Sequence, residues 1–175
     1  MGAKAERTAM RNVVDQLRYG RWANLELAKA AMLLSPEEFT RATGSSFTSI
    51  HATLVHLLWA EQLWFARWSG GPPVPKLNPE TLPTADAVHR GLELIHAEQL
   101  AFLGTSSSEH ADRPVSYRNA VGETWSYSLR DMVQHVVIHS AFHRGQIATL
   151  FRQIGKAAPH TDYLVYVDVA GTAGM

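Results

Sequence analysis

The sequence predicts an all-α protein that folds as a four-helix bundle. Apolar residues recur at helical spacing along four long stretches, helix-start and helix-stop signals lie between these stretches, and strand-like alternation is confined to one short region. The chain has 175 residues, of which 46% are hydrophobic and 18% are charged. This length and composition predict a single domain over residues 1–175 with one substantial core.

The first long helix is expected over residues 8–34. Residues at helical spacing along it form an inward stripe that is apolar at both ends and polar in its middle, at Arg21 and Asn24. The sequence Ser35-Pro36-Glu37-Glu38 then combines an N-cap serine, a proline at the first helical position and a glutamate three residues after the cap. These signals predict a short helix at that point.

The second long helix is expected over residues 46–69, which are largely apolar. Two glycines and two prolines at 70–73 stop it, and the chain stays proline-rich up to Pro83. Extended chain of this length can cross a bundle instead of joining antiparallel neighbours. We therefore expect a long crossover between the second and third long helices.

The third long helix is expected from Thr84 to Leu103, with Gly104 as its C-terminal cap. A loop and a possible hairpin follow it. Residues 114–118 and 123–127 are two short β-prone runs that flank a turn-forming segment. This region is the one expected departure from helical structure.

The fourth long helix is expected to begin at Ser128, where Ser-Leu-Arg-Asp resembles a capping box, and to end before Gly155. The tail should pack on the bundle up to about Tyr166 and be flexible after about residue 167. Four long helices with little other structure are typical of a four-helix bundle.

Composition excludes several classes of function. Lys and Arg together number 16, as do Asp and Glu, so the formal net charge is zero, which argues against a dedicated nucleic-acid binder. The chain has no cysteine, so disulfides, thiolate metal sites and cysteine nucleophiles are excluded. Its N-terminus is polar and no apolar run reaches about 18 residues, so we expect neither a signal peptide nor a membrane span, and a cytoplasmic location.

Three of the nine histidines recur at every fourth residue of the fourth long helix, at His135, His139 and His143. They share one face of that helix with apolar residues, so this face should point inward. Burying several imidazoles on an apolar face requires either hydrogen bonds or a metal ion. The spacing therefore makes this face a candidate metal site.

Helix geometry limits which of these rings can share an ion. A rise of about 1.5 Å per residue places ligands four residues apart at about 6 Å, close enough to converge, and ligands eight residues apart at about 12 Å, which is too far. Either His135 with His139 or His139 with His143 satisfies this limit. A third ligand must come from another helix, and the candidate is His56, in the apolar second helix.

One alternative role for these histidines stays open, and two other kinds of metal site are excluded by the residues present. A lone inward histidine is often a hydrogen-bonded core residue with no metal. The His-Glu-x-x-His pattern of a zinc protease is absent, because no Glu follows the first His. A di-iron carboxylate bundle needs two Glu-x-x-His motifs, whereas the chain offers Glu93 to His96 and no Glu in the fourth helix.

Polar members of the inward stripes are candidates to surround such a site: Arg21, Asn24, Glu61 and Gln146. Each can equally make hydrogen bonds between helices. Glu61 is a candidate to orient a ligand histidine or to act as a base, with an ion pair as the alternative. Arg144 is expected to anchor the tail or a dimer contact, and Gly145 to allow close approach of helices.

Four segments together resemble the DinB/YfiT-like superfamily: residues 17–24, 49–64, 135–147 and 161–166. The resemblance implies a bundle with an up-down-down-up arrangement, a homodimer, and one divalent metal held by three histidines. Matching the segments residue by residue assigns those ligands to His56, His139 and His143 and leaves His135 as a neighbour. Phe142 stands where many relatives carry another histidine, and should make that flank of the site drier.

The resemblance also suggests what the site does. Some relatives are thiol-dependent S-transferases that use a low-molecular-weight thiol, and others resemble metal hydrolases. Three neutral imidazoles leave an open coordination position for a water or an external thiolate, which favours an enzyme acting on a small-molecule substrate. Zinc is the first choice of metal, with nickel or iron as alternatives. Binding should weaken below about pH 6.5, where free imidazole protonates.

Two other functions remain open. The first is a non-catalytic metal-binding stress-response protein, in which the ion is structural. The second is a DNA-associated damage-response protein, which only the family name suggests and which zero net charge disfavours.

Overall fold

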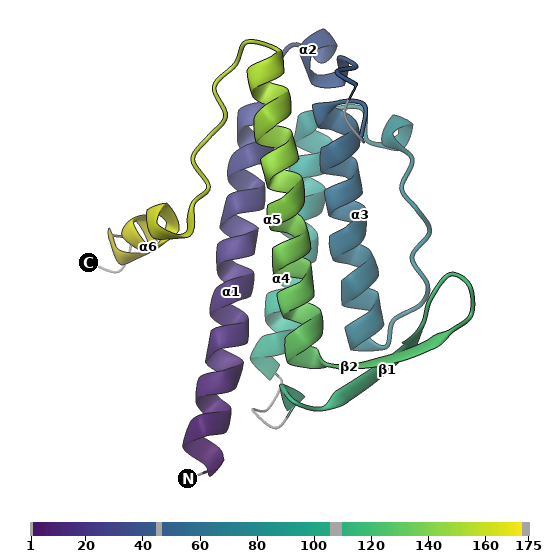
Figure 1. Cartoon of the computed structure of the whole chain (residues 1–175), viewed down its shortest axis with the longest axis vertical. Coiled ribbons are helices and arrows are strands. Elements are labelled where there is room, and N and C mark those ends of the chain that lie inside the picture. The colour runs from purple at the N-terminus through teal and green to yellow at the C-terminus, as the bar shows by residue number, and fades with distance from the viewer. Residues whose placement is uncertain (1, 45–46, 106–109, 173–175) are drawn as a thin grey trace.

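The computed structural model describes residues 2–44, 47–105 and 110–172, with side chains described from residue 12 to residue 170. Within these ranges the predicted all-α four-helix bundle is confirmed (Figure 1). The four long helices are α1 (Gly2–Ala31), α3 (Ile50–Ser69), α4 (Ala85–Thr105) and α5 (Leu129–Gln153).

The helices follow the up-down-down-up order. Figure 1 shows α1 and α5 running in one direction and α3 and α4 in the other, with the crossover from residue 70 to residue 84 along the outside of α3. This crossover contains one 3-10 turn, η1 (Pro79–Thr81). Both α1 and α3 pack against α4 and against α5, so α1 and α3 are diagonal partners and α3 and α5 are neighbours.

Serine caps set the helix starts. Ser49 has an extended backbone and its side chain accepts a hydrogen bond from the Ala52 amide, so α3 begins at Ile50 and not at Ser46, which lies outside the described residues. Ser128 caps α5 in the same way, as predicted. The predicted capping box opens α2 (Pro36–Thr40), where Ser35 and Glu38 exchange hydrogen bonds of 2.9 and 3.1 Å.

Glycines behave differently from the prediction. Gly104 lies inside the last turn of α4, which continues to Thr105, so it is not the cap. Gly145 is exposed, and an added Cβ would meet no atom within 4 Å, so it does not bring two helices together. That role belongs to Gly91 of α4, where a Cβ would lie 2.6 Å from Cδ2 of Leu58.

The expected hairpin is present, with β1 (Pro114–Arg118) antiparallel to β2 (Thr124–Ser128). The register pairs Tyr117 with Trp125 and Val115 with Tyr127, so these four side chains share one face. Tyr117 contacts Trp64 of α3 with ring centroids 5.6 Å apart, which shows that this apolar face is turned toward the bundle.

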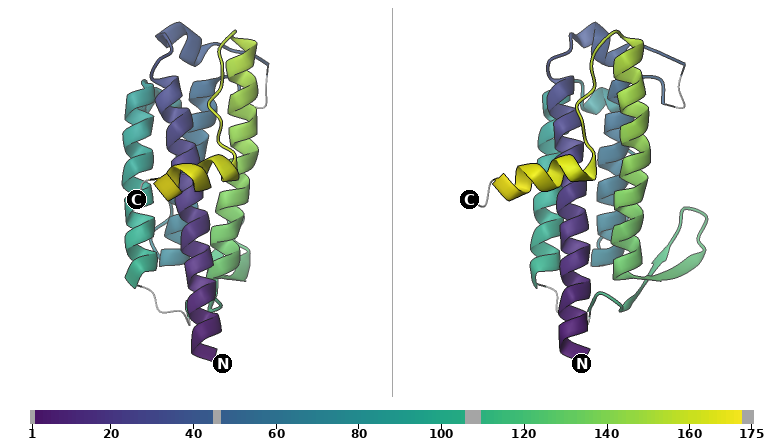
Figure 2. Two further views of the ribbon diagram at one scale, coloured as in Figure 1. Left: turned by 90° about the vertical axis from the view of Figure 1, so that its left-hand side faces the viewer. Right: turned by 60° about the vertical axis from the view of Figure 1, so that its left-hand side comes forward.

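The tail returns to α1 and ends in α6 (Tyr163–Thr172), which crosses α1 and projects from the bundle (Figure 2). Tyr163 and Tyr166 pack on Tyr19 of α1 with ring centroids 5.2 and 5.8 Å apart. The hydroxyl of Tyr19 donates a hydrogen bond of 2.9 Å to the carbonyl of Thr161. Thr161, Tyr163 and Tyr166 therefore attach the tail to Tyr19 of α1.

Two hydrophobic clusters fill the bundle, one toward each end. The first includes Leu27, Leu54, Leu58, Leu92, Leu150 and Phe151, and the second includes Leu17, Trp68, Leu103, Met132 and Val136. A layer of buried polar residues separates them along all four long helices: Asn24, Glu61, His96, Gln99, Ser140 and Arg144. The candidate site lies at this level of the bundle. Among the described helices, none is both long enough and apolar enough to cross a membrane.

Candidate metal centre

Three histidines from two neighbouring helices converge at one point. His56 comes from α3, and His139 and His143 come from successive turns of α5. One ring nitrogen from each lies within 4.8 Å of the other two, and the Nε2 atoms of His139 and His143 are 3.1 Å apart. Nitrogens that bind one tetrahedral ion at about 2.1 Å lie about 3.4 Å from one another. Rotations of the rings would therefore bring all three nitrogens within binding distance of a single ion.

The nitrogens themselves are suited to a cation. The buried Nδ1 of His56 makes no hydrogen bond to any described protein atom. A buried polar nitrogen without a partner is costly, and a metal ion on that side of the ring would satisfy it. The convergence of one nitrogen from each ring within 4.8 Å shows that the residues present could hold one divalent ion.

Gln146 fixes the orientation of one of these rings. Its side-chain oxygen lies 2.7 Å from Nδ1 of His143. An amide oxygen only accepts hydrogen bonds, so Nδ1 carries the proton and the Nε2 lone pair faces His139. Gln146 therefore lies beside the three converging histidines and contacts one of them.

Burial keeps the three rings neutral. Burial lowers the pKa of His56 to about 4, and the nearby His143 and His139 rings add to the effect. Burial likewise lowers the pKa of His139 to about 4, with repulsion from His143 and His135 adding to it and the Glu61 charge opposing it. The pKa of His143 is lowered by burial, against the hydrogen bond to Gln146. Neutral imidazole is the form that binds metals.

Phe47 covers the site and was missed by the sequence analysis. Its ring stacks on His56 at 4.3 Å and meets the His143 ring edge-on at 5.3 Å. Phe142 also touches the His143 ring, at 5.4 Å, but it is 66% exposed on the outside of α5. The apolar cover therefore comes from Phe47, in the segment before α3, for which no spacing rule gives a signal.

Glu61 lies in the polar layer and not at the open side of the site. Its carboxylate accepts hydrogen bonds of 3.0 Å from Asn24, 2.9 Å from Ser140 and 2.9 Å from Gln99. Only 2% of Glu61 is exposed, so a carboxylate held in this way is positioned to orient its neighbours and not to meet a substrate. The predicted interhelical role of Asn24 and Glu61 is observed, and Ser140 links them to the turn that carries His139.

His96 is buried beside Glu61. Its Nε2 lies 3.9 Å from the carboxylate, beyond hydrogen-bonding distance. Burial raises the pKa of the Glu61 carboxyl, whereas His96 and the hydrogen bonds from Gln99 and Ser140 lower it, and the lowering effect is the larger. The carboxylate is therefore ionised in the interior, where removal of any of its partners is costly.

Arg144 is linked to the tail through Tyr19, which bears on the tail-anchoring role that is one of the two expected for it. It is buried and donates hydrogen bonds to Oδ1 of Asn24 at 3.0 Å and to the hydroxyl of Tyr19 at 3.3 Å. Tyr19 in turn holds the Thr161 carbonyl. Arg21, the other polar residue of the α1 stripe, is half-buried.

His135 lies beside the three histidines without joining them. Its ring is parallel to that of His139, with centroids 5.7 Å apart, and packs on Trp64 at 4.3 Å. Burial lowers the pKa of His135, and the charge of Arg67 adds to the effect. His51 is also separate, since its Nε2 bonds the Leu82 carbonyl at 2.8 Å.

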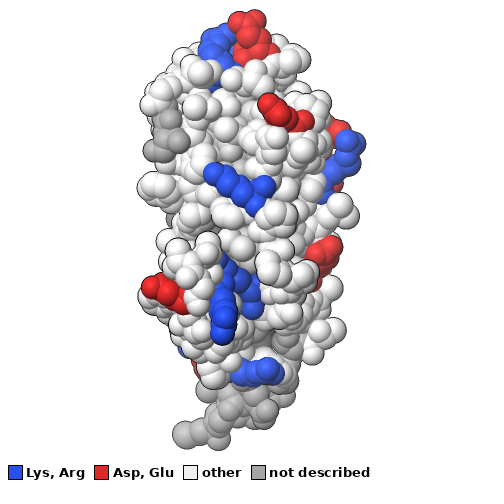
Figure 3. All heavy atoms as spheres, turned by 90° about the vertical axis from the view of Figure 1, so that its right-hand side faces the viewer, with Lys and Arg blue, Asp and Glu red and all other residues white. Residues whose placement is uncertain are grey.

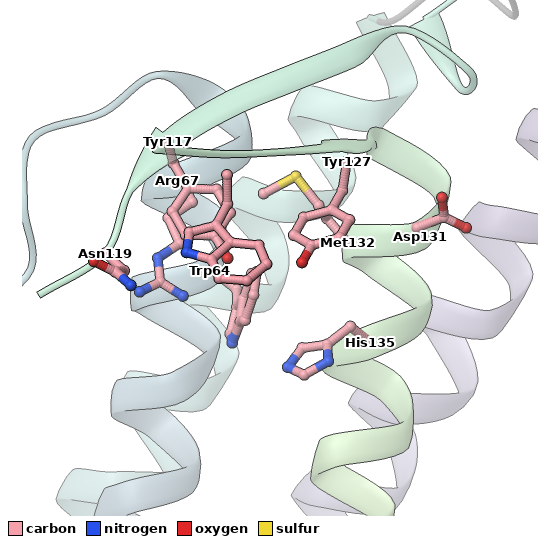
Figure 4. A pocket seen from close by; sticks show the side chains of 9 residues that line it. Trp64, Arg67, Tyr117, Asn119, Tyr127, Asp131, Met132 and His135 are labelled. Carbon is pink, nitrogen blue, oxygen red and sulfur yellow. The ribbon is translucent and has the colours of Figure 1, made fainter. Parts of the chain in front are cut away.

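A cavity lies on each flank of the site. One, of about 540 Å³, lies between the hairpin, α3 and α5 and is lined by His135 but by none of the three converging histidines (Figure 4). The other, of about 310 Å³, is lined by His56 together with Phe47, Trp59 and Lys76. A small molecule in either cavity would lie next to a ring of the site or one ring away from it.

Charges on the outer surface are mixed. Figure 3 shows one face of the molecule, on which the described Lys and Arg side chains are interspersed with Asp and Glu among a mostly uncharged surface.

Comparisons with known proteins agree with this fold. A family model described as the DinB family matches residues 4–175. Protein DinB of Bacillus subtilis (strain 168) is similar, with 26% identity over 164 residues that cover 88% of this chain and 92% of that protein.

Two crystal structures are similar in fold. A DinB-like protein from Bacillus cereus ATCC 10987 has a TM-score of 0.66 and 14% identity, covering 86% of this chain and 95% of that one. The DinB-like protein YjoA from Bacillus subtilis has a TM-score of 0.60 and 18% identity, covering 86% of this chain and 97% of that one. Since the family model spans nearly all of the sequence, the chain belongs to the DinB family.

Proposed function

We propose that the chain is a metal-dependent enzyme that acts on a small molecule through one divalent cation held by His56, His139 and His143. The observation that supports this most is the convergence of three ring nitrogens within 4.8 Å, between two cavities. Imidazole ligands in this number are typical of zinc sites, and nickel and iron accept the same donors. Zinc is the metal we propose.

The proposed reaction is thiol-dependent S-transfer or hydrolysis. When bound, a divalent cation with three imidazole ligands supplies an open position at which a water is acidified or a thiolate is held. Gln146 keeps the proton on Nδ1 of His143, burial keeps the imidazoles neutral, and Phe47 shields two of the rings from water. The chain has no cysteine, so the thiolate must come from a separate low-molecular-weight thiol.

The non-catalytic alternative is a metal that only fastens α3 to α5. The 3% exposure of His143 favours it, because structural sites are closed. The two hydrophobic clusters and the Glu61 layer join the same helices without any metal, which favours the enzyme. A structural metal predicts that removing the metal unfolds the bundle, whereas an enzyme site predicts that the bundle stays folded.

Elemental analysis of the natively purified protein tests the metal. We expect about one divalent ion per chain in the wild type and a large loss in His139→Ala. His135→Ala is the matched control, because it removes a histidine one turn away on the same helix, and it should keep its metal. Equal metal content in wild type and His139→Ala would overturn the ligand assignment.

An activity screen then tests the chemistry. Wild type, His139→Ala and His135→Ala are incubated with low-molecular-weight thiols and electrophiles, and with hydrolysable esters and amides. We expect turnover by the wild type that His139→Ala loses. The resemblance further suggests a homodimer, which sedimentation velocity tests independently.

A further inference from the structure

The hairpin presents an aromatic face to the bundle without burying it. Trp125 and Tyr127 of β2 lie on the same face as Tyr117, which contacts Trp64 of α3. They nevertheless remain 44% and 41% exposed. The reason is the cavity of about 540 Å³ beneath them, which all four aromatic residues line. Its volume is within the range of small-molecule pockets.

Arg67 supplies a charge inside this cavity. Its guanidinium carbon lies 4.5 Å from the ring centroid of Trp64 and 4.4 Å from that of Tyr117. Among the described residues no carboxylate pairs with it. A guanidinium held between rings keeps its planar fork in place, and this fork binds carboxylates through two hydrogen bonds.

The one acidic side chain that lines the cavity does not neutralise Arg67. The Asp131 carboxylate accepts a hydrogen bond of 2.7 Å from the Ser128 hydroxyl at the start of α5. Figure 4 shows Asp131 across the opening from Arg67, with the Trp64 and Tyr127 rings between them. The arginine end of the cavity is therefore cationic.

The cavity also comes within one ring of the proposed metal centre. His135 lines it and stacks on His139, with ring centroids 5.7 Å apart. A ligand that extends from Arg67 toward His135 would place its far end one ring away from the three histidines. In Figure 4, His135 lies on the side of the cavity opposite Arg67.

We propose that this cavity binds an organic carboxylate with a planar ring, whose carboxylate pairs with Arg67 and whose ring stacks among Trp64, Tyr117, Trp125 and Tyr127. Such a compound is the class of substrate that we assign to the metal centre, and in this respect the inference rests on the proposed function. Recognition of the carboxylate itself requires no metal.

The test compares two probes of the same shape, naphthalene-2-carboxylate and naphthalene-2-carboxamide. Binding to the full chain is measured by titration calorimetry, after removal of metal with a chelator, because a carboxylate can also bind a divalent ion directly. We expect the wild type to bind the carboxylate about tenfold tighter than the amide. Arg67→Met keeps the side-chain stem over the rings and should reduce this preference to less than about twofold.

Controls separate charge, stacking and folding. Arg152→Met, near the far end of α5, removes an exposed arginine and should keep the wild-type preference. Trp125→Ala, on the exposed hairpin, should weaken both probes equally because it removes stacking and leaves the charge. Equal affinity of the two probes for the wild type, no saturable binding of either, or an unchanged preference in Arg67→Met would each overturn the proposal.

Failure of this inference is distinguishable from failure of the proposed function. His139→Ala should lose metal and keep the preference for the carboxylate, whereas Arg67→Met should keep metal and lose the preference. A wild type that contains no metal when it is natively purified, and that still prefers the carboxylate, would overturn the proposed function and support the carboxylate site. A preference lost in His139→Ala would overturn the carboxylate site as described.

Discussion

Nδ1 of His143 donates a hydrogen bond of 2.7 Å to the side-chain oxygen of Gln146, less than one helical turn further along α5. The bond selects one tautomer and one rotation of the ring. It also explains how the Nε2 atoms of His143 and His139 come to lie 3.1 Å apart. Nε2 of His143 then carries a lone pair. Without a metal, Nε2 of His139 can donate a proton to that lone pair, and with a metal bound both Nε2 lone pairs can point at the ion. A side chain outside the three histidines thus sets the state in which they meet.

Gln146→Leu should therefore weaken metal binding without removing a ligand. Loss of such an outer hydrogen bond typically costs about 10- to 100-fold in metal affinity. The measurement is a competition titration of zinc against a coloured chelator. Gln134→Leu, which changes an exposed glutamine of the same helix, is the control and should bind zinc as the wild type does. Wild-type affinity in Gln146→Leu would show that the hydrogen bond does not orient the ring.

The metal-free protein should lose stability on acidification over a defined range. His56 and His139 have pKa values of about 4 in the folded chain, against about 6.5 for free imidazole. Between these two pKa values the unfolded chain therefore binds more protons than the folded chain. The free energy of unfolding should fall as the pH drops from about 6.5 toward 4, and above pH 6.5 these two groups should not affect it. Urea unfolding at several pH values measures this dependence. The double variant His56→Ala/His139→Ala, which lacks both groups, should show a weaker dependence of its free energy of unfolding on pH.

Zinc binding should follow the same pKa values. Protons compete with the metal only where the folded, metal-free site begins to protonate, so occupancy should change little from pH 8 to about 5.5 and fall steeply as the pH approaches 4. This range is lower than the one expected from free imidazole, because burial, which the sequence does not give, moves both rings. Equilibrium dialysis at fixed free zinc measures the occupancy. Half-loss near pH 6.5 would contradict the lowered pKa values.

Much of the fold follows from local signals in the sequence. The capping serines before α2 and α5 and the Gly-Pro stop after α3 lie where the sequence places them, and the hairpin is present with its second strand one residue later than predicted. These features depend on a few neighbouring residues, which is why they can be read locally. The start of α3 was placed too early, because Ser46 and Ser49 are both acceptable caps by composition and the structure uses Ser49.

The site was only partly determined by spacing. His135 with His139 and His139 with His143 are equivalent by helix geometry, and the resemblance alone favoured the second pair. The structure gives the physical reason, because α3 and α5 are antiparallel neighbours. His56 then lies opposite His139 and His143, while Trp64, two turns further along α3, lies opposite His135 at 4.3 Å. Phe47 depends on the path of a loop, which no periodicity describes.

Glu61→Ala should be strongly destabilising although Glu61 lies outside the converging histidines. The carboxylate accepts three hydrogen bonds, and its removal takes this acceptor away from buried polar groups on three other helices. A buried donor that loses its acceptor typically costs about 1–3 kcal/mol, and three donors are affected here. Urea unfolding of the metal-free protein measures the change. Glu98→Ala, on the exposed face of α4, is the control and should change the free energy of unfolding by less than about 0.5 kcal/mol. A similarly small value for Glu61→Ala would mean that the layer of buried polar residues relaxes or fills with water.

Two glycines inside long helices should respond to the same substitution with opposite signs. Alanine is favoured over glycine by up to about 1 kcal/mol in a helix interior, and Gly145 offers open space, so Gly145→Ala should stabilise the protein by about that amount. At Gly91 the new methyl group would lie 2.6 Å from Leu58, which is 1% exposed and enclosed by the core on both sides. Overpacking costs about 1–3 kcal/mol, which exceeds the helix gain, so Gly91→Ala should be destabilising. Thermal and urea unfolding of both variants decide the matter, and a stabilised Gly91→Ala would show that α3 and α4 are not packed as closely as Leu58 indicates.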